Sequence, residues 1–135
     1  MINLETTDRL WRYIPHDTRE AVAIDSLVPY FRDRVIKVLA RMRACGQEPY
    51  CIWGFRVWGT LFSKHKKGKA CDIISWDDLH EGGNGWSAPI AFWQVLARYY
   101  TENGIFSGSV WTKKNGILGD KAHGEWRGGK VAKIR

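Results

Sequence analysis

Four residues of this chain have the types and the spacing needed to build a metal centre with a base beside it. His65 and Asp72 stand seven positions apart with Gly68 between them, and Asp120 stands three positions before His123. Two histidines and one carboxylate leave the fourth position of a tetrahedral zinc ion open for water, as in catalytic rather than structural zinc sites. The second carboxylate could then take a proton from that water. The set therefore predicts metal-assisted hydrolysis.

The elements around these residues must bring them together. Residues 69–75 are predicted to form a strand that carries Asp72. Gly68 precedes this strand, and a tight turn at a residue that accepts positive φ can fold His65 back toward the carboxylate. His123 must then arrive from an adjoining strand or loop, so the site would join the two halves of one sheet.

Apolar residues at helical spacing predict two helices. The first is capped by Asp25-Ser26 and stops at Gly46, and the second opens at Pro89 and closes at Asn103-Gly104. The other segments are predicted as strands at 50–57, 69–75, 105–111 and 125–134, and as loops at 77–87 and 113–119. A helix followed by strands mixed with one more helix predicts a single α+β domain, residues 1–135, with a small antiparallel sheet and flanking helices.

The positive charge of the chain concerns its partners rather than its fold. The formal net charge is +7, and four lysines crowd around His65: Lys64, Lys66, Lys67 and Lys69. This balance favours an anionic polymer, and the candidates are the bacterial wall, nucleic acid and an acidic membrane surface. A basic surface that serves only solubility is the alternative.

The apolar segments of the chain predict neither a membrane span nor a secretory signal. No apolar run approaches the ~20 residues that cross a bilayer. The first residues lack the basic and apolar regions of a signal peptide. We therefore expect synthesis in the cytoplasm without a membrane partner.

Several cysteines and histidines are expected to have no chemical role. The three cysteines are an odd number without C-x-x-C spacing, which favours reduced thiols. Cys51 and Cys71 lie in apolar runs and are predicted to be small buried side chains. His16 and His80 are predicted to lie in solvated loops, the latter among acidic residues.

Beyond these patterns, the segment 63–72 resembles the S-x-H-x-x-G-x-A-x-D signature of the M15 family of zinc peptidases. This family includes D-alanyl-D-alanine carboxypeptidases, the D-Ala-D-Ala dipeptidases of vancomycin resistance and phage L-alanyl-D-glutamate endolysins. Residues 53–56 resemble its G-[FY]-R segment, residues 105–111 its G-G-D-W-type strand, and residues 120–126 its closing D-x-x-H segment. The similarity runs from about the first helix to Trp126.

The resemblance implies a Hedgehog/DD-peptidase-like fold and a role for each matching residue. It implies the following roles: zinc ligands His65, Asp72 and His123, general base Asp120, substrate-carbonyl or oxyanion contact Arg56, and pocket-lining residue Ser63. The implied cofactor is Zn²⁺, and the implied substrate is a peptidoglycan peptide.

The chain departs from the family pattern at two places. Only the six residues 57–62 separate Arg56 from the signature, fewer than the family usually has, which leaves the register of Arg56 open. Its alternative role is an ion pair with Asp72 or Glu125. Gly108-Ser109 stands where the family has Gly-Asp, and this substitution predicts that a carboxylate behind the ligands is missing.

The sequence thus predicts a zinc-dependent peptidase that hydrolyses the stem peptides of bacterial peptidoglycan. Small size, positive charge and the absence of a recognisable signal favour a phage-type L-alanyl-D-glutamate endolysin, released to the wall through holin-type holes made by another protein. The alternatives are a D-Ala-D-Ala carboxypeptidase, a non-catalytic basic domain that binds the wall or, as the less favoured partner, nucleic acid, and an inactive tail-associated phage component.

Overall fold

The computed structural model describes residues 12–57, 63–110 and 120–133. Within these ranges, four antiparallel strands form one sheet in the order β1-β2-β4-β3. The strands are β1 (Pro49–Trp53), β2 (Ala70–Ser75), β3 (Phe106–Ser107) and β4 (His123–Glu125). The predicted α+β class with an antiparallel sheet is confirmed. The predicted loop at 113–119 lies outside the described residues.

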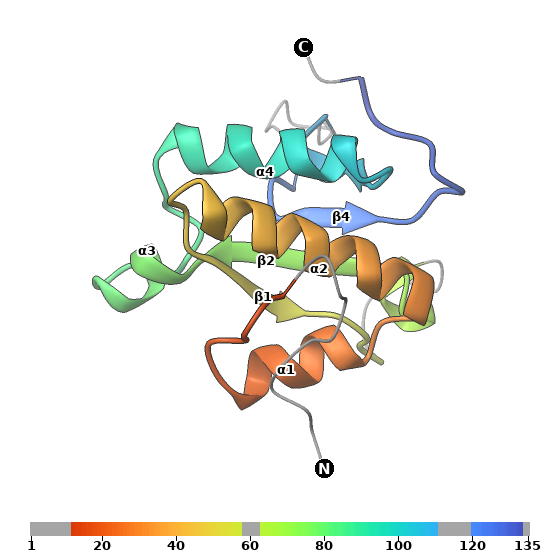
Figure 1. Ribbon diagram of the computed structural model, residues 1–135, viewed down its shortest axis with the longest axis horizontal. Coiled ribbons are helices and arrows are strands. Elements are labelled where there is room, and N and C mark those ends of the chain that lie inside the picture. Colours follow the sequence, from red (N-terminus) through yellow and green to blue (C-terminus); the bar gives the residue numbers. More distant parts are fainter. Residues whose placement is uncertain (1–11, 58–62, 111–119, 134–135) are drawn as a thin grey trace.

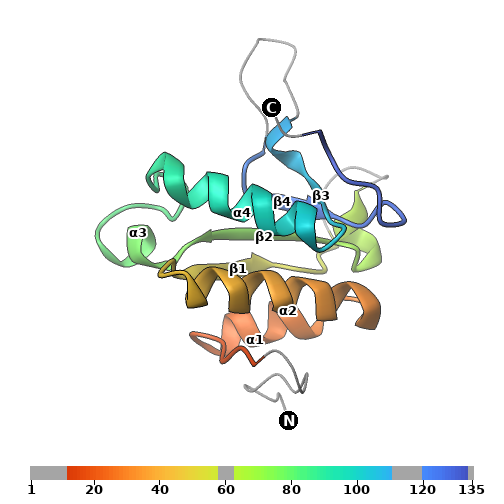
Figure 2. The ribbon, with the colours of Figure 1, turned by 45° about the horizontal axis from the view of Figure 1, so that its top comes forward.

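The helices pack around this sheet, as Figures 1 and 2 show. They are α1 (Thr18–Asp25), α2 (Pro29–Ala44), α3 (Trp76–His80) and α4 (Ile90–Glu102). Helices α2 and α4 contact each other, and α1 packs against the edge strand β1. Cys71 of β2 contacts Tyr100 of α4 through its sulfur, at 3.5 Å from the phenol oxygen. Because side chains alternate along a strand, the neighbouring Asp72 lies on the opposite face of β2.

Helix α2 confirms the first predicted helix but not its predicted cap. Phe31, Val35 and Leu39 are fully buried, as helical spacing requires. The N-cap is Val28, which makes no side-chain cap, and Pro29 follows at the first helical position. Asp25 instead ends α1, a helix that the sequence analysis did not predict and that begins after the capping residue Asp17. The prediction of an Asp25-Ser26 cap is therefore wrong.

The predicted strands exist, but three of them have different limits. β1 ends at Trp53 rather than at 57. The next residue, Gly54, lies against α1, where a Cβ would collide with the Ala23 carbonyl. The third strand is shortened by a 3₁₀ turn at Gly108–Val110. The last strand occupies 123–125 instead of 125–134, and the chain after it turns at Gly128 and Gly129, both of which have positive φ.

The second predicted helix has nearly the predicted limits, whereas the loop predicted before it does not. α4 begins after Pro89 and ends at Asn103, with Gly104 at a φ of 70°. The predicted loop at 77–87 is wrong at its start, because residues 76–80 form α3. The Ser75 hydroxyl caps this helix by accepting a hydrogen bond from the backbone N–H of Asp78 at 3.1 Å.

The described part of the chain contains no helix with both the length and the apolar character that crossing a bilayer requires. Its three cysteines are unpaired thiols. Cys51 and Cys71 are buried, as predicted, and Cys45 is exposed.

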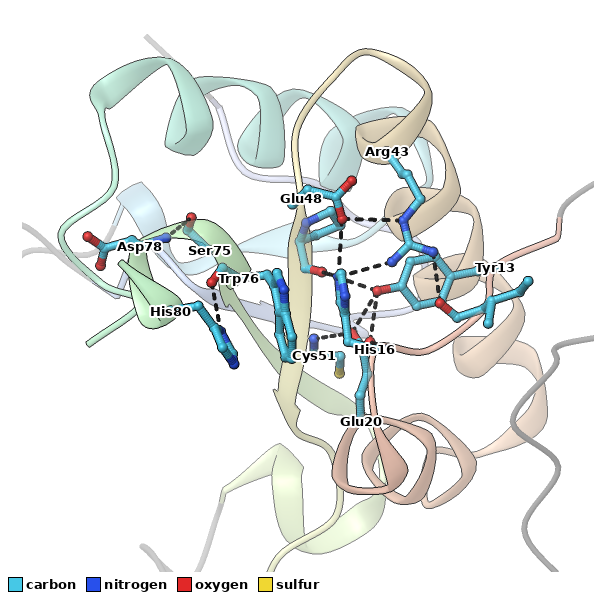
Figure 3. A network of polar contacts seen from close by, with 12 residues as sticks. Tyr13, His16, Glu20, Arg43, Glu48, Cys51, Ser75, Trp76, Asp78 and His80 are labelled. Carbon is cyan, nitrogen blue, oxygen red and sulfur yellow. Dashed lines mark hydrogen bonds and ion pairs between the residues drawn. The ribbon is translucent and has the colours of Figure 1, made fainter. Parts of the chain in front are cut away.

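A polar network ties the segment before α1 to the sheet (Figure 3). The fully buried carboxylate of Glu20 accepts hydrogen bonds from the backbone N–H groups of His16, at 2.7 Å, and of Cys51, at 2.6 Å. The Tyr13 hydroxyl donates to the same carboxylate at 2.8 Å. His16 lies in a loop, as predicted, but it is half-buried rather than solvated, and its ring stacks on Trp76 with centroids 4.1 Å apart. His80 is exposed, as predicted.

Glu20 makes the stability of the fold depend on pH. Burial raises the pKa of this carboxyl group from 4.5 to about 7, although the backbone hydrogen bonds from His16 and Cys51 oppose the shift. The folded state therefore binds the proton more tightly than the unfolded chain, so the contribution to stability is complete below pH 4.5 and is lost as the pH rises past about 7.

We expect the substitution Glu20→Gln to remove this pH dependence. The free energy of unfolding of the wild type, taken relative to that of the variant, should fall by on the order of 3 kcal/mol from acid to mildly alkaline pH. Urea unfolding at a series of pH values measures the difference. The exposed Glu81→Gln is the matched control and should follow the wild type. Parallel curves for the wild type and Glu20→Gln would contradict the assignment.

Candidate metal centre

The first half of the candidate centre is a cross-strand pair. Asp72 of β2 lies opposite His123 of β4 in the antiparallel register. Directly opposed residues on paired strands project to the same face of the sheet. The Nδ1 atom of His123 accordingly lies 3.4 Å from the Oδ1 atom of Asp72.

The second half is His65, which a short 3₁₀ helix brings to the same point. This helix, Lys64–Lys67, ends at Gly68, whose φ of 66° is the left-handed conformation that the sequence analysis expected of the turn. The turn directs His65 back onto β2, where its Nε2 atom lies 3.4 Å from the Oδ2 atom of Asp72.

The structure thus brings together the three side chains that the sequence analysis selected as metal ligands. His65, Asp72 and His123 each offer one ligand atom, and these atoms all lie within 4.8 Å of one another. The side chains are buried, with 1%, 4% and 7% of their residue surfaces exposed. The three residues lie on the face of β2 opposite the one that contacts α4.

In each imidazole ring, His65 and His123, one nitrogen makes a hydrogen bond directed away from Asp72, and this bond determines that the other nitrogen faces the centre. Nδ1 of His65 lies 2.8 Å from the carbonyl oxygen of Gly54, which can only accept, so this nitrogen carries the proton and Nε2 faces Asp72. Nε2 of His123 lies 2.8 Å from a carboxylate oxygen of Glu125, while Nδ1 faces Asp72. The two rings therefore present different nitrogens to one point, in the manner of metal-bound histidines held by outer hydrogen bonds.

Two buried atoms at this point favour a bound cation. Within the described residues, His65 Nε2 and Asp72 Oδ1 have no hydrogen-bond partner. Their separations of 3.4 Å from neighbouring charged groups are longer than the roughly 2.8 Å of a strong ionic hydrogen bond. Buried polar atoms without partners are costly, and a divalent ion would satisfy both at once. Two imidazole nitrogens and a carboxylate also match the ligand preference of zinc.

The electrostatics of the group favour an ionised Asp72. Burial opposes ionisation, but the nearby His123 and His65 imidazoles favour the charged carboxylate, and they hold the pKa of Asp72 well below its usual range. For His123, burial lowers the pKa, whereas Asp72 and Glu125 raise it, and the result is a pKa of about 9. The anionic ligand and the two imidazoles thus form a tightly coupled set.

Asp120 lies beside this group, in the turn that leads into β4. Its backbone N–H donates to the Gly108 carbonyl at 3.1 Å, and its own carbonyl accepts from the backbone N–H of His123 at 3.2 Å. Burial and the charge of Asp72 raise the pKa of Asp120, against a smaller lowering by His123. Its Oδ1 atom is buried and has no hydrogen-bond partner among the described residues. A carboxylate with a raised pKa and an available oxygen suits a general base.

Arg56 reaches the centre despite the short segment that follows it. One of its terminal nitrogens lies 3.8 Å from Asp72 Oδ2, and its backbone N–H donates to the carbonyl of His65 at 3.3 Å. The guanidinium is therefore near the ligands, and the ion pair with Asp72 that was the alternative for this residue is present. Ser63 has a local role, since its hydroxyl caps the 3₁₀ helix by accepting from the backbone N–H of His65.

A further carboxylate, Glu125, lies against His123, and its place in the centre was not predicted from the sequence. The carboxylate that the family pattern has at the Gly108-Ser109 position is absent, since residue 109 is a serine. Glu125, from strand β4, instead places a carboxylate oxygen 2.8 Å from His123 Nε2. Glu125 is buried and contacts Arg127 at 2.8 Å on its other oxygen. The signal available in the sequence was the two-residue spacing of His123 and Glu125, which puts both on one face of a strand.

The fold is similar to that of a solved peptidase. The chain matches the crystal structure of the L-Ala D-Glu endopeptidase ChiX of Serratia marcescens with a TM-score of 0.57 and 18% sequence identity, over 84% of this chain and 90% of that chain. No family model matches the chain, and no curated protein matches its sequence. At this identity the likeness concerns the fold, so the resemblance to the M15 family stays a prediction from the motifs.

We expect the purified chain to bind about one zinc ion, and to lose this binding in His65→Ala. Removing one imidazole leaves two ligands, too few to hold zinc firmly. Binding to the folded state alone also stabilises it, by roughly 3–4 kcal/mol at 100–1,000 times the dissociation constant. Calorimetric titration and zinc-dependent melting measure the two effects. His80→Ala, which removes an exposed imidazole, should bind like the wild type, and equal binding by His65→Ala would contradict the assignment.

Proposed function

We propose that this chain is a zinc-dependent peptidase that hydrolyses the stem peptides of bacterial peptidoglycan. The observation that carries the proposal is the convergence of His65, Asp72 and His123 on one buried point, with Asp120 beside it. The fold likeness to an L-Ala D-Glu endopeptidase supports the same class of substrate. The motif resemblance to zinc peptidases supports the metal and the reaction.

In this proposal each residue of the site has one task. His65, Asp72 and His123 hold the ion. Zinc, when bound, acts as a Lewis acid that polarises a carbonyl and lowers the pKa of a bound water to about 7. Asp120 accepts the proton of the attacking water and returns it to the leaving amine. Its raised pKa suits both transfers, because the carboxylate is a stronger base than an ordinary aspartate.

Arg56 is proposed to act on the scissile carbonyl. Its guanidinium lies 3.8 Å from Asp72 and so borders the place where the carbonyl oxygen would approach. A fixed cation there stabilises the negative charge that develops on this oxygen as water adds. Ser63, at the start of the 3₁₀ helix, is proposed to line the substrate pocket.

The basic segment around His65 supports an anionic substrate. Four lysines lie in or next to the 3₁₀ helix that carries His65: Lys64, Lys66, Lys67 and Lys69. Stem peptides and wall polymers carry carboxylates or phosphates, which such a field would attract. We propose cleavage between L-alanine and D-glutamate, as expected of a phage-type endolysin that reaches the wall through holin-type holes. The whole chain, residues 1–135, would form the single peptidase domain.

Digestion of purified peptidoglycan followed by mass spectrometry of the muropeptides tests the proposal. New peptides that begin with D-glutamate support the endopeptidase. Release of terminal D-alanine alone would assign a D-Ala-D-Ala carboxypeptidase instead. Absence of any new end with the zinc-loaded chain, together with binding to intact walls, would assign a non-catalytic binding domain. A chelator should abolish the digestion, and added zinc should restore it.

Asp120→Asn should separate catalysis from metal binding. The amide cannot accept the proton of water, so kcat should fall by about 10²–10⁴-fold, whereas zinc binding should stay within a few fold. Hydrolysis of a synthetic stem peptide measures the first quantity and calorimetry the second. Asp77→Asn, which changes an exposed residue of α3, is the matched control and should leave both unchanged. Full activity of Asp120→Asn would remove this residue from the mechanism.

Arg56→Lys should distinguish a role on substrate from a role on Asp72. If the guanidinium acts on the carbonyl, kcat should fall by about 10²-fold with unchanged zinc affinity. If Arg56 only pairs with Asp72, zinc affinity should change while kcat of the zinc-loaded variant is retained. Kinetics at saturating zinc measure kcat, and a separate titration measures zinc affinity, so the two roles can be told apart. Arg32→Lys, at an exposed ion pair with Asp25, is the control.

A further inference from the structure

We propose that Glu125, anchored by Arg127, is a positioning residue that fixes the tautomer and the ring orientation of His123, so that Nδ1 faces the metal. The inference rests on the proposed zinc function and assigns a further residue to it. Glu125 Oε1 lies 2.8 Å from His123 Nε2, and Glu125 Oε2 lies 2.8 Å from Arg127 Nε. The carboxylate therefore bridges the imidazole and the guanidinium.

The short strand β4 makes this bridge geometrically possible. His123 and Glu125 are separated by one residue and so project to the same face. The residue between them, Gly124, lies against α4, where a Cβ would come within 2.6 Å of the Tyr100 ring. The strand is thus held with its glycine toward the helix and both functional side chains toward the site.

The position of the imidazole proton decides whether His123 can bind a metal. A neutral imidazole has one N–H, and only the other nitrogen has a lone pair to donate to an ion. Glu125 is 2.8 Å from Nε2, whereas Asp72 is 3.4 Å from Nδ1. In the neutral imidazole that a bound metal requires, the closer carboxylate holds the N–H of Nε2, which leaves the Nδ1 lone pair directed at Asp72 and the centre.

Arg127 holds the carboxylate in place for this task. Its guanidinium donates to Glu125 and also lies over the ring of Phe106, with 3.7 Å between the central carbon and the ring centroid. A carboxylate fixed between a cation and an imidazole cannot rotate away without losing both contacts. His65, by contrast, is oriented by the backbone carbonyl of Gly54, so Glu125 is the orienting group that a substitution can remove.

Zinc affinity, measured by competition with a chromophoric chelator, tests the inference. Glu125→Ala should weaken zinc binding by about 10–100-fold, the effect typical of losing a partner of a metal-bound histidine. Glu125→Gln should weaken it less, because the amide oxygen can still accept the N–H of His123. Arg127→Lys keeps a cation beside the carboxylate and should restore most of the affinity that Arg127→Ala loses.

A nitrogen NMR spectrum of the zinc-loaded protein gives a readout that a purely structural role would not change. In the wild type, the Nε2 proton of His123 should exchange slowly with water, and in Glu125→Ala it should exchange rapidly. Glu102→Gln is the matched control, since it alters an exposed carboxylate that pairs with Arg98. Melting of the metal-free variants identifies a loss of folding, and if Glu125→Ala does not fold, Glu125→Gln carries the test.

The outcomes separate this inference from the proposed function. Wild-type zinc affinity and an unchanged His123 spectrum in folded Glu125→Ala and Glu125→Gln would overturn the positioning role and leave the peptidase proposal intact. A wild-type chain that binds no zinc would overturn the proposed function and the positioning role with it. If Glu125→Ala loses zinc affinity and the Nε2 proton of its His123 exchanges rapidly with water, the result supports the positioning role and the proposed zinc function.

Discussion

The pairing of β2 with β4 is the constraint on which the candidate site depends. In this register Asp72 lies opposite His123. A slip by one residue would place His123 on the other face, because side chains alternate along a strand. Such a slip would bring a residue with a side chain to the position of Gly124, where a Cβ would collide with the Tyr100 ring. The Tyr100 hydroxyl also donates to the Ala122 carbonyl at 2.7 Å, so helix α4 fixes the strand at the residue before the ligand.

Charge balance explains how so many polar groups remain buried there. Asp72 and Glu125 are both nearly buried carboxylates, and each has a guanidinium on its outer side, Arg56 for the first and Arg127 for the second. The two imidazoles occupy the space between. Buried charges are tolerated when they are paired and hydrogen-bonded. Among the described residues, one buried atom each of His65, Asp72 and Asp120 still has no hydrogen-bond partner.

Local patterns predicted the parts of the fold that local chemistry determines. Helix α2, the turn at Gly68 and strand β2 follow from apolar spacing and from the conformational freedom of glycine. The limits of β4 depend on pairing with distant strands, which the sequence does not display. Helix α1 was missed because its eight residues offer too short an apolar pattern. The spacing of Asp17 and Glu20, typical of a helix start, was the signal available in the sequence.

The atoms that a metal would bind also lower the stability of the metal-free fold. An imidazole nitrogen and a carboxylate oxygen buried without hydrogen-bond partners each carry a desolvation cost of about 1–3 kcal/mol. An ion that satisfies both atoms recovers that cost, so part of the binding free energy becomes folding free energy. Because Asp72 lies in a central strand while His65 and His123 lie in segments on either side of it, the same ion would join the 3₁₀ helix to β4. The proposed function and part of the stability of the fold would therefore depend on the same three side chains.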